Sequence, residues 1–322
     1  MMKLIFIVLY ICGSLLSAQN KICNYCKQKI SQEYLIVDDK YFHPEHFLCA
    51  KCNKTINGEY VKNEGKFYHP QCYTEEFIPK CDVCGLPLDG EYFQDLFGNK
   101  YHEKHIQENK RCDNCDRLIS KNITGGGYSF SDGRSLCNLC YNDAVPSNSV
   151  FDFLLTKVSN ELRSMGINLP QNKIKIKAVD RSGLKDAAKS NYTERLKGFC
   201  NIENTEQTFG IKKIKNFSAT IYVLNKIPAD YVESTIAHEL MHVWIDQNTS
   251  KNHTSELVEG SCNFISYKYL SNKNSKNKKD IITALQNDPN PIYGGGFRKV
   301  FSKFGAKHII ELLNYLKNNS KI

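Results

Sequence analysis

The distribution of apolar residues divides the chain into regions of different character. An uncharged, mostly apolar run extends from Leu4 to Ala18 and is followed by a cysteine-rich region. Beyond that region, apolar side chains recur at helical spacing over residues 149–165, which predicts an amphipathic helix. "NKIKIKAVD" and "FSATIYVLN" predict strands, and "IPADYVESTIAHELMHVWIDQ" predicts a helix that begins near Ala229 or Asp230.

The N-terminal run has the layout of a secretory signal peptide. A lysine precedes it, a small residue ends it, and it is shorter than the roughly 20 residues that span a bilayer. We therefore expect residues 1–18 to be cleaved and the protein to be exported, to a periplasm or to the exterior. An uncleaved anchor is the alternative. We expect no other membrane contact.

Length and charge limit the remaining possibilities. A chain of 322 residues has room for two or three domains, and 41% hydrophobic with 24% charged residues is ordinary for a globular protein. The formal charge of +9 is modest and lies in loops such as "SNKNSKNKKD". This pattern indicates solvated surface, so we expect no nucleic-acid partner.

Cysteine and histidine recur in pairs with two residues between the members. Eleven of the 14 cysteines and five of the nine histidines lie between residues 23 and 140, and all belong to such pairs. The spacing lets both side chains converge on one metal, and the eight pairs are enough for four tetrahedral zinc ions. A disulfide framework is the alternative that export would favour, but histidine cannot join a disulfide.

Local sequence indicates how the pairs group. "YFHPEHFLCAKCNKTINGEYVKNEGKFYHPQC" resembles LIM domains, with His46 where cysteine is usual; a RING finger with interleaved metals also fits the spacing. A looser LIM-like module follows over residues 79–143, with six rather than two residues between its halves. The predicted ligand sets are Cys23, Cys26, His43 and His46, then Cys49, Cys52, His69 and Cys72 in the LIM domain (21–76), and Cys81, Cys84, His102 and His105, then Cys112, Cys115, Cys137 and Cys140 in the LIM-like module.

The sequence "HELMH" holds a second kind of metal motif, H-E-x-x-H. His238 and His242 are four residues apart on a predicted helix, so both imidazoles project from one face and can bind one zinc. Glu239 would accept a proton from a zinc-activated water. A strand before this helix is the context that the motif requires.

A catalytic zinc takes three protein ligands and keeps one open position. "SELVEGSCNFISYKYL" predicts a second helix, with Glu256 and Glu259 near its start. Ser255 is a possible N-cap, which gives Glu256 a role beside the helix dipole. Glu259 is therefore the expected third ligand and Glu256 the alternative. Gly260 would let this helix closely approach the H-E-x-x-H helix.

Three segments together resemble the plant organ-size peptidases of the DA-one family: "HELMHVW", "LVEGSC" and "PIYGGGFRKV". The resemblance implies a zinc endopeptidase that acts on proteins, with His238, His242 and Glu259 as ligands and Glu239 as base. Plant members carry ubiquitin-interacting helices before the LIM domain. Cys23 follows the apolar run almost directly, so we expect ubiquitin not to be a partner.

The predicted architecture is multidomain: two LIM-type zinc modules followed by an α+β zincin domain of gluzincin type over residues 147–322. The predicted function is zinc-dependent peptide hydrolysis, with one catalytic and four structural zinc ions. The LIM modules would recruit protein substrates, bind a protein partner or regulate the peptidase. The alternative is a non-catalytic LIM adaptor with a degenerate peptidase domain.

Two questions stay open at this level. Cys200 and Cys262 are either buried thiols or a disulfide. Four residues could stabilise the developing oxyanion, namely Tyr267, Tyr293, Arg298 and His308. The sequence gives no geometry with which to choose among them.

Overall fold

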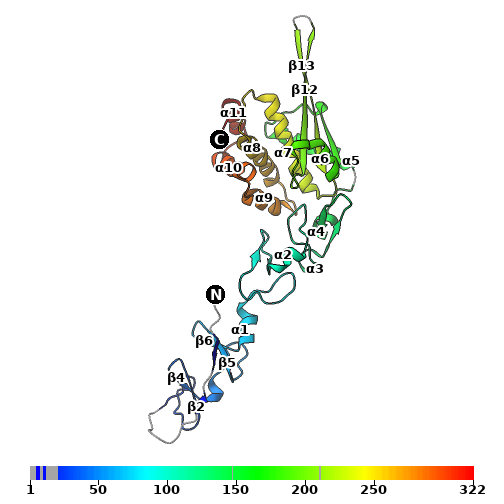
Figure 1. Ribbon diagram of the computed structural model, residues 1–322. Helices are drawn as coiled ribbons and strands as arrows, with labels where there is room; N and C mark the ends of the chain where they lie inside the picture. The colour runs from blue at the N-terminus through cyan, green and yellow to red at the C-terminus, as the bar shows by residue number, and fades with distance from the viewer. Residues whose placement is uncertain (1–4, 8–9, 12–20, 147, 210–211) are drawn as a thin grey trace. The chain divides into compact units, whose positions relative to one another are not determined.

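The computed structural model describes residues 5–7, 10–11, 21–146, 148–209 and 212–322 (Figure 1). Its contacts define two compact units, one up to residue 94 together with 99–105, and one of residues 95–98 together with 106–322. The predicted signal peptide lies largely outside the described residues; its described parts are the short strands β1 (Ile5–Ile7) and β2 (Tyr10–Ile11). Among described helices, none has the length and apolarity needed to cross a membrane.

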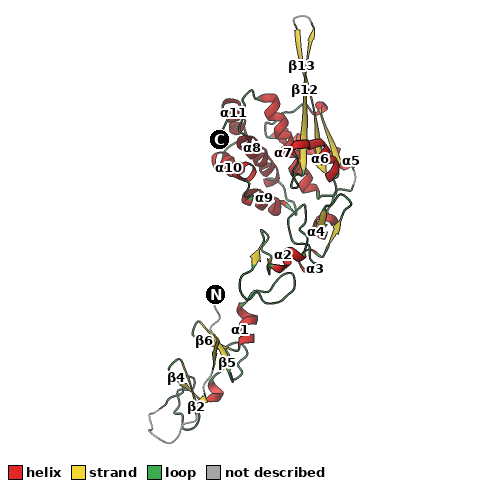
Figure 2. Cartoon of the chain, viewed as in Figure 1, coloured by secondary structure: helices red, strands yellow, loops and turns green. Residues whose placement is uncertain are grey.

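The first unit consists of short antiparallel strands and brief helices (Figure 2). β3 pairs with β2 and β4, β5 pairs with β1 and β6, and β7 pairs with β8. The remaining elements of this region are β3 (Tyr34–Val37), β4 (Lys40–Phe42), the 3-10 helix η1 (Pro44–His46), β5 (Glu59–Asn63), β6 (Lys66–Tyr68), α1 (Pro70–Phe77), β7 (Phe93–Gln94), β8 (Lys100–Tyr101) and α2 (Lys104–Glu108).

Aromatic rings form the core of the first unit. The Phe47 ring centroid lies 4.9 Å from that of Phe67 and 5.3 Å from that of Tyr60. Phe47 is fully buried, and Phe42 packs edge-on against Phe67. So small a core supplies limited stability, which fits a region whose folding depends on metal.

The second unit begins with small elements and continues into a sheet with many helices. These are α3 (Lys121–Thr124), β9 (Gly127–Ser129), β10 (Ser135–Cys137), α4 (Asn138–Asn142), α5 (Asn148–Ser164), η2 (Gln171–Lys173), β11 (Ile174–Val179), α6 (Arg181–Ala188), η3 (Lys189–Asn191), β12 (Gly198–Phe209), β13 (Lys212–Leu224), α7 (Ala229–Asn248), α8 (Ser255–Ser271), α9 (Lys278–Asn287), the π-helix η4 (Pro291–Gly295), α10 (Gly296–Phe304) and α11 (Ile309–Asn318).

The sheet has β13 at its centre, parallel to β11 and antiparallel to β12. The ends of β12 and β13 form a long hairpin beyond the rest of the sheet (Figure 1). β11, α5 and the start of α7 at Ala229 confirm the strand and helix predictions to within a residue or two. β13 confirms the second predicted strand, but it begins at Lys212, five residues before the predicted segment. The zincin class itself stays a prediction.

Helix α7 lies between the sheet and the other C-terminal helices. It contacts β12 and β13, and α8 covers it on the side away from the sheet (Figure 2). Ile236, Ala237, Leu240 and Trp244 are buried, as predicted. Ser234 Oγ lies 2.6 Å from Ser266 Oγ, which ties α7 to α8 within the protein interior.

The predicted LIM-like module does not form one compact body. Cys81, Cys84, His102 and His105 belong to the first unit, and Cys112, Cys115, Cys137 and Cys140 belong to the second. The four cysteines of the second set share a hydrophobic core with α5, the sheet and α7. This shared core makes the last cysteine set a structural part of the C-terminal unit.

Candidate metal centres and active site

The structure brings the predicted cysteine and histidine ligands together in four groups that follow the sequence order. Within each group, one potential ligand atom per residue lies within 4.8 Å of the others. An interleaved arrangement of the RING type would combine different pairs, so the grouping agrees with the LIM alternative. The groups are Cys23, Cys26, His43 and His46; Cys49, Cys52, His69 and Cys72; Cys81, Cys84, His102 and His105; and Cys112, Cys115, Cys137 and Cys140.

Distances within the groups fit zinc and not disulfides. Cys52 Sγ lies 3.4 Å from His69 Nδ1, and Cys115 Sγ lies 3.7 Å from Cys137 Sγ. Ligands of one tetrahedral zinc lie about 3.6 Å (S to N) or about 3.8 Å (S to S) apart, whereas a disulfide requires about 2.05 Å. The described cysteines are all free thiols. These clusters are compatible with structural zinc.

Backbone amides favour the thiolate form of the first cysteine in three groups. Burial opposes ionisation, but backbone N–H groups of Cys26 and His43 hold the pKa of Cys23 at about 6. The pKa values of Cys49 and Cys81 are also about 6 for the same reasons. A thiolate at neutral pH is the form that binds metal.

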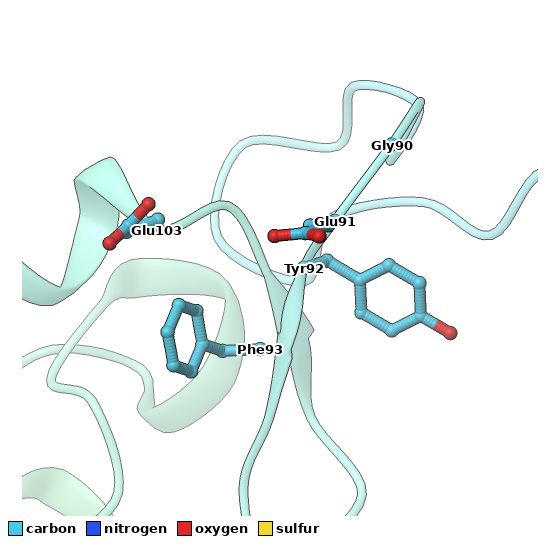
Figure 3. A pocket seen from close by; sticks show the side chains of 5 residues that line it. All are labelled: Gly90, Glu91, Tyr92, Phe93 and Glu103. Carbon is cyan, nitrogen blue, oxygen red and sulfur yellow. The ribbon is translucent and has the colours of Figure 1, made fainter.

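A surface cavity of about 430 Å³ lies beside the third group, in the first unit. Glu91 and Phe93 project to one side of their strand together with Glu103, and Tyr92 projects to the other (Figure 3). Tyr92 and Phe93 are exposed. None of the lining residues belongs to the four cysteine and histidine groups.

The H-E-x-x-H segment lies on α7, and its two histidines converge with a carboxylate from α8. The Nε2 atoms of His238 and His242 are 3.2 Å apart. Oε2 of Glu259 lies 3.2 Å from the first and 3.6 Å from the second. Ligands about 2.0–2.1 Å from one tetrahedral zinc are about 3.3–3.4 Å apart, so the three atoms fit a zinc ion.

The electrostatics of this cluster also suit a cation. Oε2 of Glu259 is buried and has no hydrogen-bond partner among the described residues. Burial would raise the pKa of Glu259, but His238 and His242 outweigh it and lower that pKa. Burial likewise opposes protonation of His238, yet Glu259 and Glu239 raise its pKa. The site therefore favours added positive charge, which a divalent ion supplies.

The alternative carboxylate, Glu256, lies elsewhere. Its Oε1 pairs with Lys299 Nζ at 2.8 Å, on the side of α8 that meets α10. The predicted cap residue is wrong by one position, because Thr254 rather than Ser255 accepts the Leu257 N–H at 3.4 Å. Glu256 remains in the first turn of the helix, where an acidic side chain interacts favourably with the dipole.

Gly260 does provide a close approach, but the predicted partner is wrong. A Cβ at Gly260 would lie 2.4 Å from the backbone carbon of Gly296 on α10, not against α7. A Cβ at Gly296 would lie 2.3 Å from the Glu256 carbonyl oxygen. Two glycines therefore lock α10 onto the turn of α8 that carries Glu259.

Asn263 contacts His238, one of the candidate ligands, and it was not among the residues predicted from the sequence. Its Oδ1 lies 2.9 Å from His238 Nδ1, and its Nδ2 donates to the Tyr293 carbonyl at 3.2 Å. If Nδ1–H donates to the amide oxygen, the Nε2 lone pair faces the metal position. Asn263 is four residues after Glu259 on α8, so helical spacing was the one signal available.

Glu239 is almost completely buried beside the start of β12. A Cβ at Gly198 would lie 3.1 Å from Oε1 of Glu239, and the backbone N–H of Cys200 donates to this carboxylate. Burial raises the pKa of Glu239, and the two histidines only partly oppose it. A carboxylate with a raised pKa is a stronger proton acceptor than an exposed one.

Cys200 and Cys262 are free thiols rather than a disulfide. Cys262 is fully buried, and its Sγ lies within 4.8 Å of ring nitrogens of both His238 and His242. Burial, followed by the charges of nearby carboxylates, raises the pKa of both thiols. Cys262 is thus near enough to the two histidines to be a further potential metal ligand, whereas Cys200 is a partly buried thiol that packs against the core.

Comparisons with known proteins agree with this arrangement. A family model of the LIM domain matches residues 23–77, and one described as DA1-like, Protein DA1, matches residues 201–286, the segment with His238, Glu239, His242 and Glu259.

Three plant relatives match over much of the chain. Protein DA1-related 2 of Arabidopsis thaliana is 27% identical over 91% of this chain and 68% of its own length. LIM domain-containing protein HDR3 of Oryza sativa subsp. japonica is 25% identical over 92% and 73%. Protein DA1 of Arabidopsis thaliana is 24% identical over 74% and 56%. With a LIM domain followed by a DA1-like domain, the chain belongs to the DA1 family.

Proposed function

We propose that this protein is a zinc-dependent endopeptidase. The observation that carries the proposal is the convergence of His238, His242 and Glu259, with three ligand atoms 3.2–3.6 Å apart. Their side chains are 16%, 23% and 18% exposed, so the site is partly open to solvent although Oε2 of Glu259 itself is buried. Three protein ligands with a free position are typical of catalytic zinc sites.

Each residue has a distinct part in the reaction. When bound, zinc supplies a Lewis acid that polarises a carbonyl oxygen and lowers the pKa of water. Glu239 takes a proton from the attacking water and returns it to the leaving amine. It thus acts first as general base and then as general acid. Asn263 holds His238 in the tautomer that binds metal.

The LIM-type region would bind the protein substrate or a regulatory protein. Its metal groups have four protein ligands each and leave no position for a reactant. Exposed apolar side chains such as Tyr25, Leu86 and Phe93 supply contact area. Metal sites without a free position, together with exposed aromatic side chains, support a protein-binding role for this region rather than a catalytic one.

Purified protein incubated with a mixed peptide library, with and without a chelator, tests the proposal. We expect cleavage that the chelator abolishes and added zinc restores, and five zinc ions per chain by elemental analysis, four in the cysteine-containing groups. A metal-replete protein that cleaves no peptide would favour the adaptor alternative.

A further inference from the structure

We propose that Tyr293 is a further catalytic residue, whose phenol hydroxyl donates a hydrogen bond to the scissile carbonyl oxygen as negative charge develops on it. The inference rests on the proposed peptidase function and adds a donor to it. Hydrogen-bond donors positioned for a developing oxyanion commonly make the largest single contribution to acyl-transfer catalysis.

The backbone around Tyr293 is rare and firmly held. Tyr293 lies in the π-helix η4, a rare conformation that is frequent at functional sites. Asn290 Oδ1 accepts the N–H groups of Ile292 at 2.9 Å and Tyr293 at 3.1 Å. Asn263 holds the Tyr293 carbonyl from the other side. Because the same amide contacts His238, one side chain positions both the metal ligand and this tyrosine.

Close backbone approaches at two glycines hold the segment in place: Gly294 lies against the residue that follows α9, and Gly296, the first residue of α10, lies against α8. A Cβ at Gly294 would lie 2.0 Å from the Asp288 carbonyl oxygen, and one at Gly296 would lie 2.3 Å from the Glu256 carbonyl oxygen. No side chain fits at either position. The π-helix is therefore fixed to the turn of α8 from which Glu259 projects.

The surroundings of the phenol suit a donor near the reacting atoms. Burial raises the pKa of Tyr293 to about 12, and the charges of Glu259 and Glu239 contribute to the rise. The hydroxyl therefore keeps its proton at neutral pH and can donate it in a hydrogen bond. Tyr293 is also 38% exposed, so a substrate can reach its ring.

The other three oxyanion candidates have structural roles. The Tyr267 ring packs against Phe301 at 5.2 Å between centroids. Arg298 Nη1 donates to the carbonyl oxygens of Gln286 and Asp288, at 3.0 and 2.8 Å. His308 caps α11 by accepting the Ile310 N–H. Of the four candidates, only Tyr293 shares a hydrogen-bonding partner with His238 in the described part of the chain, namely Asn263.

Tyr293→Phe tests the inference, with Tyr267→Phe as matched control. We expect Tyr293→Phe to lower kcat by about 10²–10³-fold, the effect of removing one oxyanion donor, with KM and zinc content unchanged. Tyr267→Phe should keep the parental kcat. Equal kcat in parent and Tyr293→Phe would overturn the assignment, and a loss of zinc would reassign Tyr293 to a structural role.

Binding of a phosphinic pseudopeptide separates this inference from the proposed function. Its tetrahedral phosphorus carries two oxygens, as the attacked carbon does. We expect about 10- to 100-fold weaker binding to zinc-loaded Tyr293→Phe, the worth of a hydrogen bond to a charged group. Weaker binding with no hydrolysis by the parent would overturn the peptidase proposal and keep the donor. Equal binding by parent and variant, together with peptide hydrolysis by the parent, would overturn the role of Tyr293 and keep the peptidase proposal. A parent protein that neither binds the pseudopeptide nor hydrolyses peptides would overturn both.

Discussion

The C-terminal unit contains two candidate metal-binding clusters that differ in the number of their ligands and in their exposure. Cys112, Cys115, Cys137 and Cys140 offer four ligands, and none of these residues is more than 7% exposed. His238, His242 and Glu259 offer three ligands with side chains 16–23% exposed. A tetrahedral ion is saturated in the first cluster and keeps one position in the second. The number of ligands and their exposure thus distinguish the two clusters, and they suit the first to a structural ion and the second to the proposed catalytic one.

The surroundings of the two clusters differ in the same sense. The cysteines lie in the continuous core of the unit. Nearby, the fully buried Arg134 pairs with Asp132 at 2.7 Å and donates to the backbone and side chain of Asn225 at the end of β13. The histidines instead face Asn263 and Glu259, groups that orient ligands rather than fill space. On the proposed function, the first cluster stabilises the fold and the second serves the reaction.

The largest expected effect contrasts the loss of one ligand from each cluster. Cys137→Ser should unfold the C-terminal unit, because structural zinc contributes about 10–16 kcal/mol in small domains, as much as a typical whole stability. His242→Ala should remove one zinc and leave the helices folded. Circular dichroism melting with zinc analysis checks both. A Cys137→Ser protein that melts like the parent would remove the distinction.

A second pair of variants sharpens the ligand assignment within the open cluster. Glu259→Gln should weaken or abolish zinc binding there and eliminate cleavage, because the buried carboxylate loses its charge. Glu256→Gln should cost only about 0.3–1 kcal/mol of stability through the helix dipole. Zinc titration and melting curves measure the two effects. Zinc loss from the Glu256 variant alone would move the third ligand, and equal tolerance would end the assignment.

The smallest effect concerns the orienting amide. Asn263→Ala should weaken zinc binding at the open cluster by about 10- to 100-fold, the usual cost of losing a partner of a metal-binding histidine. Asn263→Asp keeps an acceptor for His238 Nδ1 but removes the donor to Tyr293, so it should retain more of the zinc affinity. Competition with a chromogenic chelator gives both constants. Normal affinity in the alanine variant would show that the histidine needs no such support.

Local spacing accounts for the parts of the site that the sequence predicted. Pairs separated by two residues bring ligands to one metal, and His238 and His242 share a helix face because they are four residues apart. Both rules act within one element, so spacing alone predicted the pairs. The grouping of the pairs into sets of four rested on the resemblance to LIM domains, because a RING arrangement also fits the spacing.

Features that depend on contacts between elements were missed or misassigned. Asn263 on α8 forms a hydrogen bond with His238 on α7, and Gly260 packs against Gly296 of α10 rather than against α7. The last four cysteines belong to the C-terminal unit because they share its core, which spacing does not encode. Tyr293 could be chosen over Tyr267 only once their neighbours were known.

The rate of peptide cleavage by zinc-loaded Glu239→Gln tests the central claim most directly. The substitution keeps the shape of a side chain that is not a metal ligand, so zinc content should equal that of the parent. Cleavage should fall by about 10²–10⁴-fold, the usual contribution of a general base. A Glu239→Gln protein with full zinc that cleaves peptides at the parental rate would contradict the account.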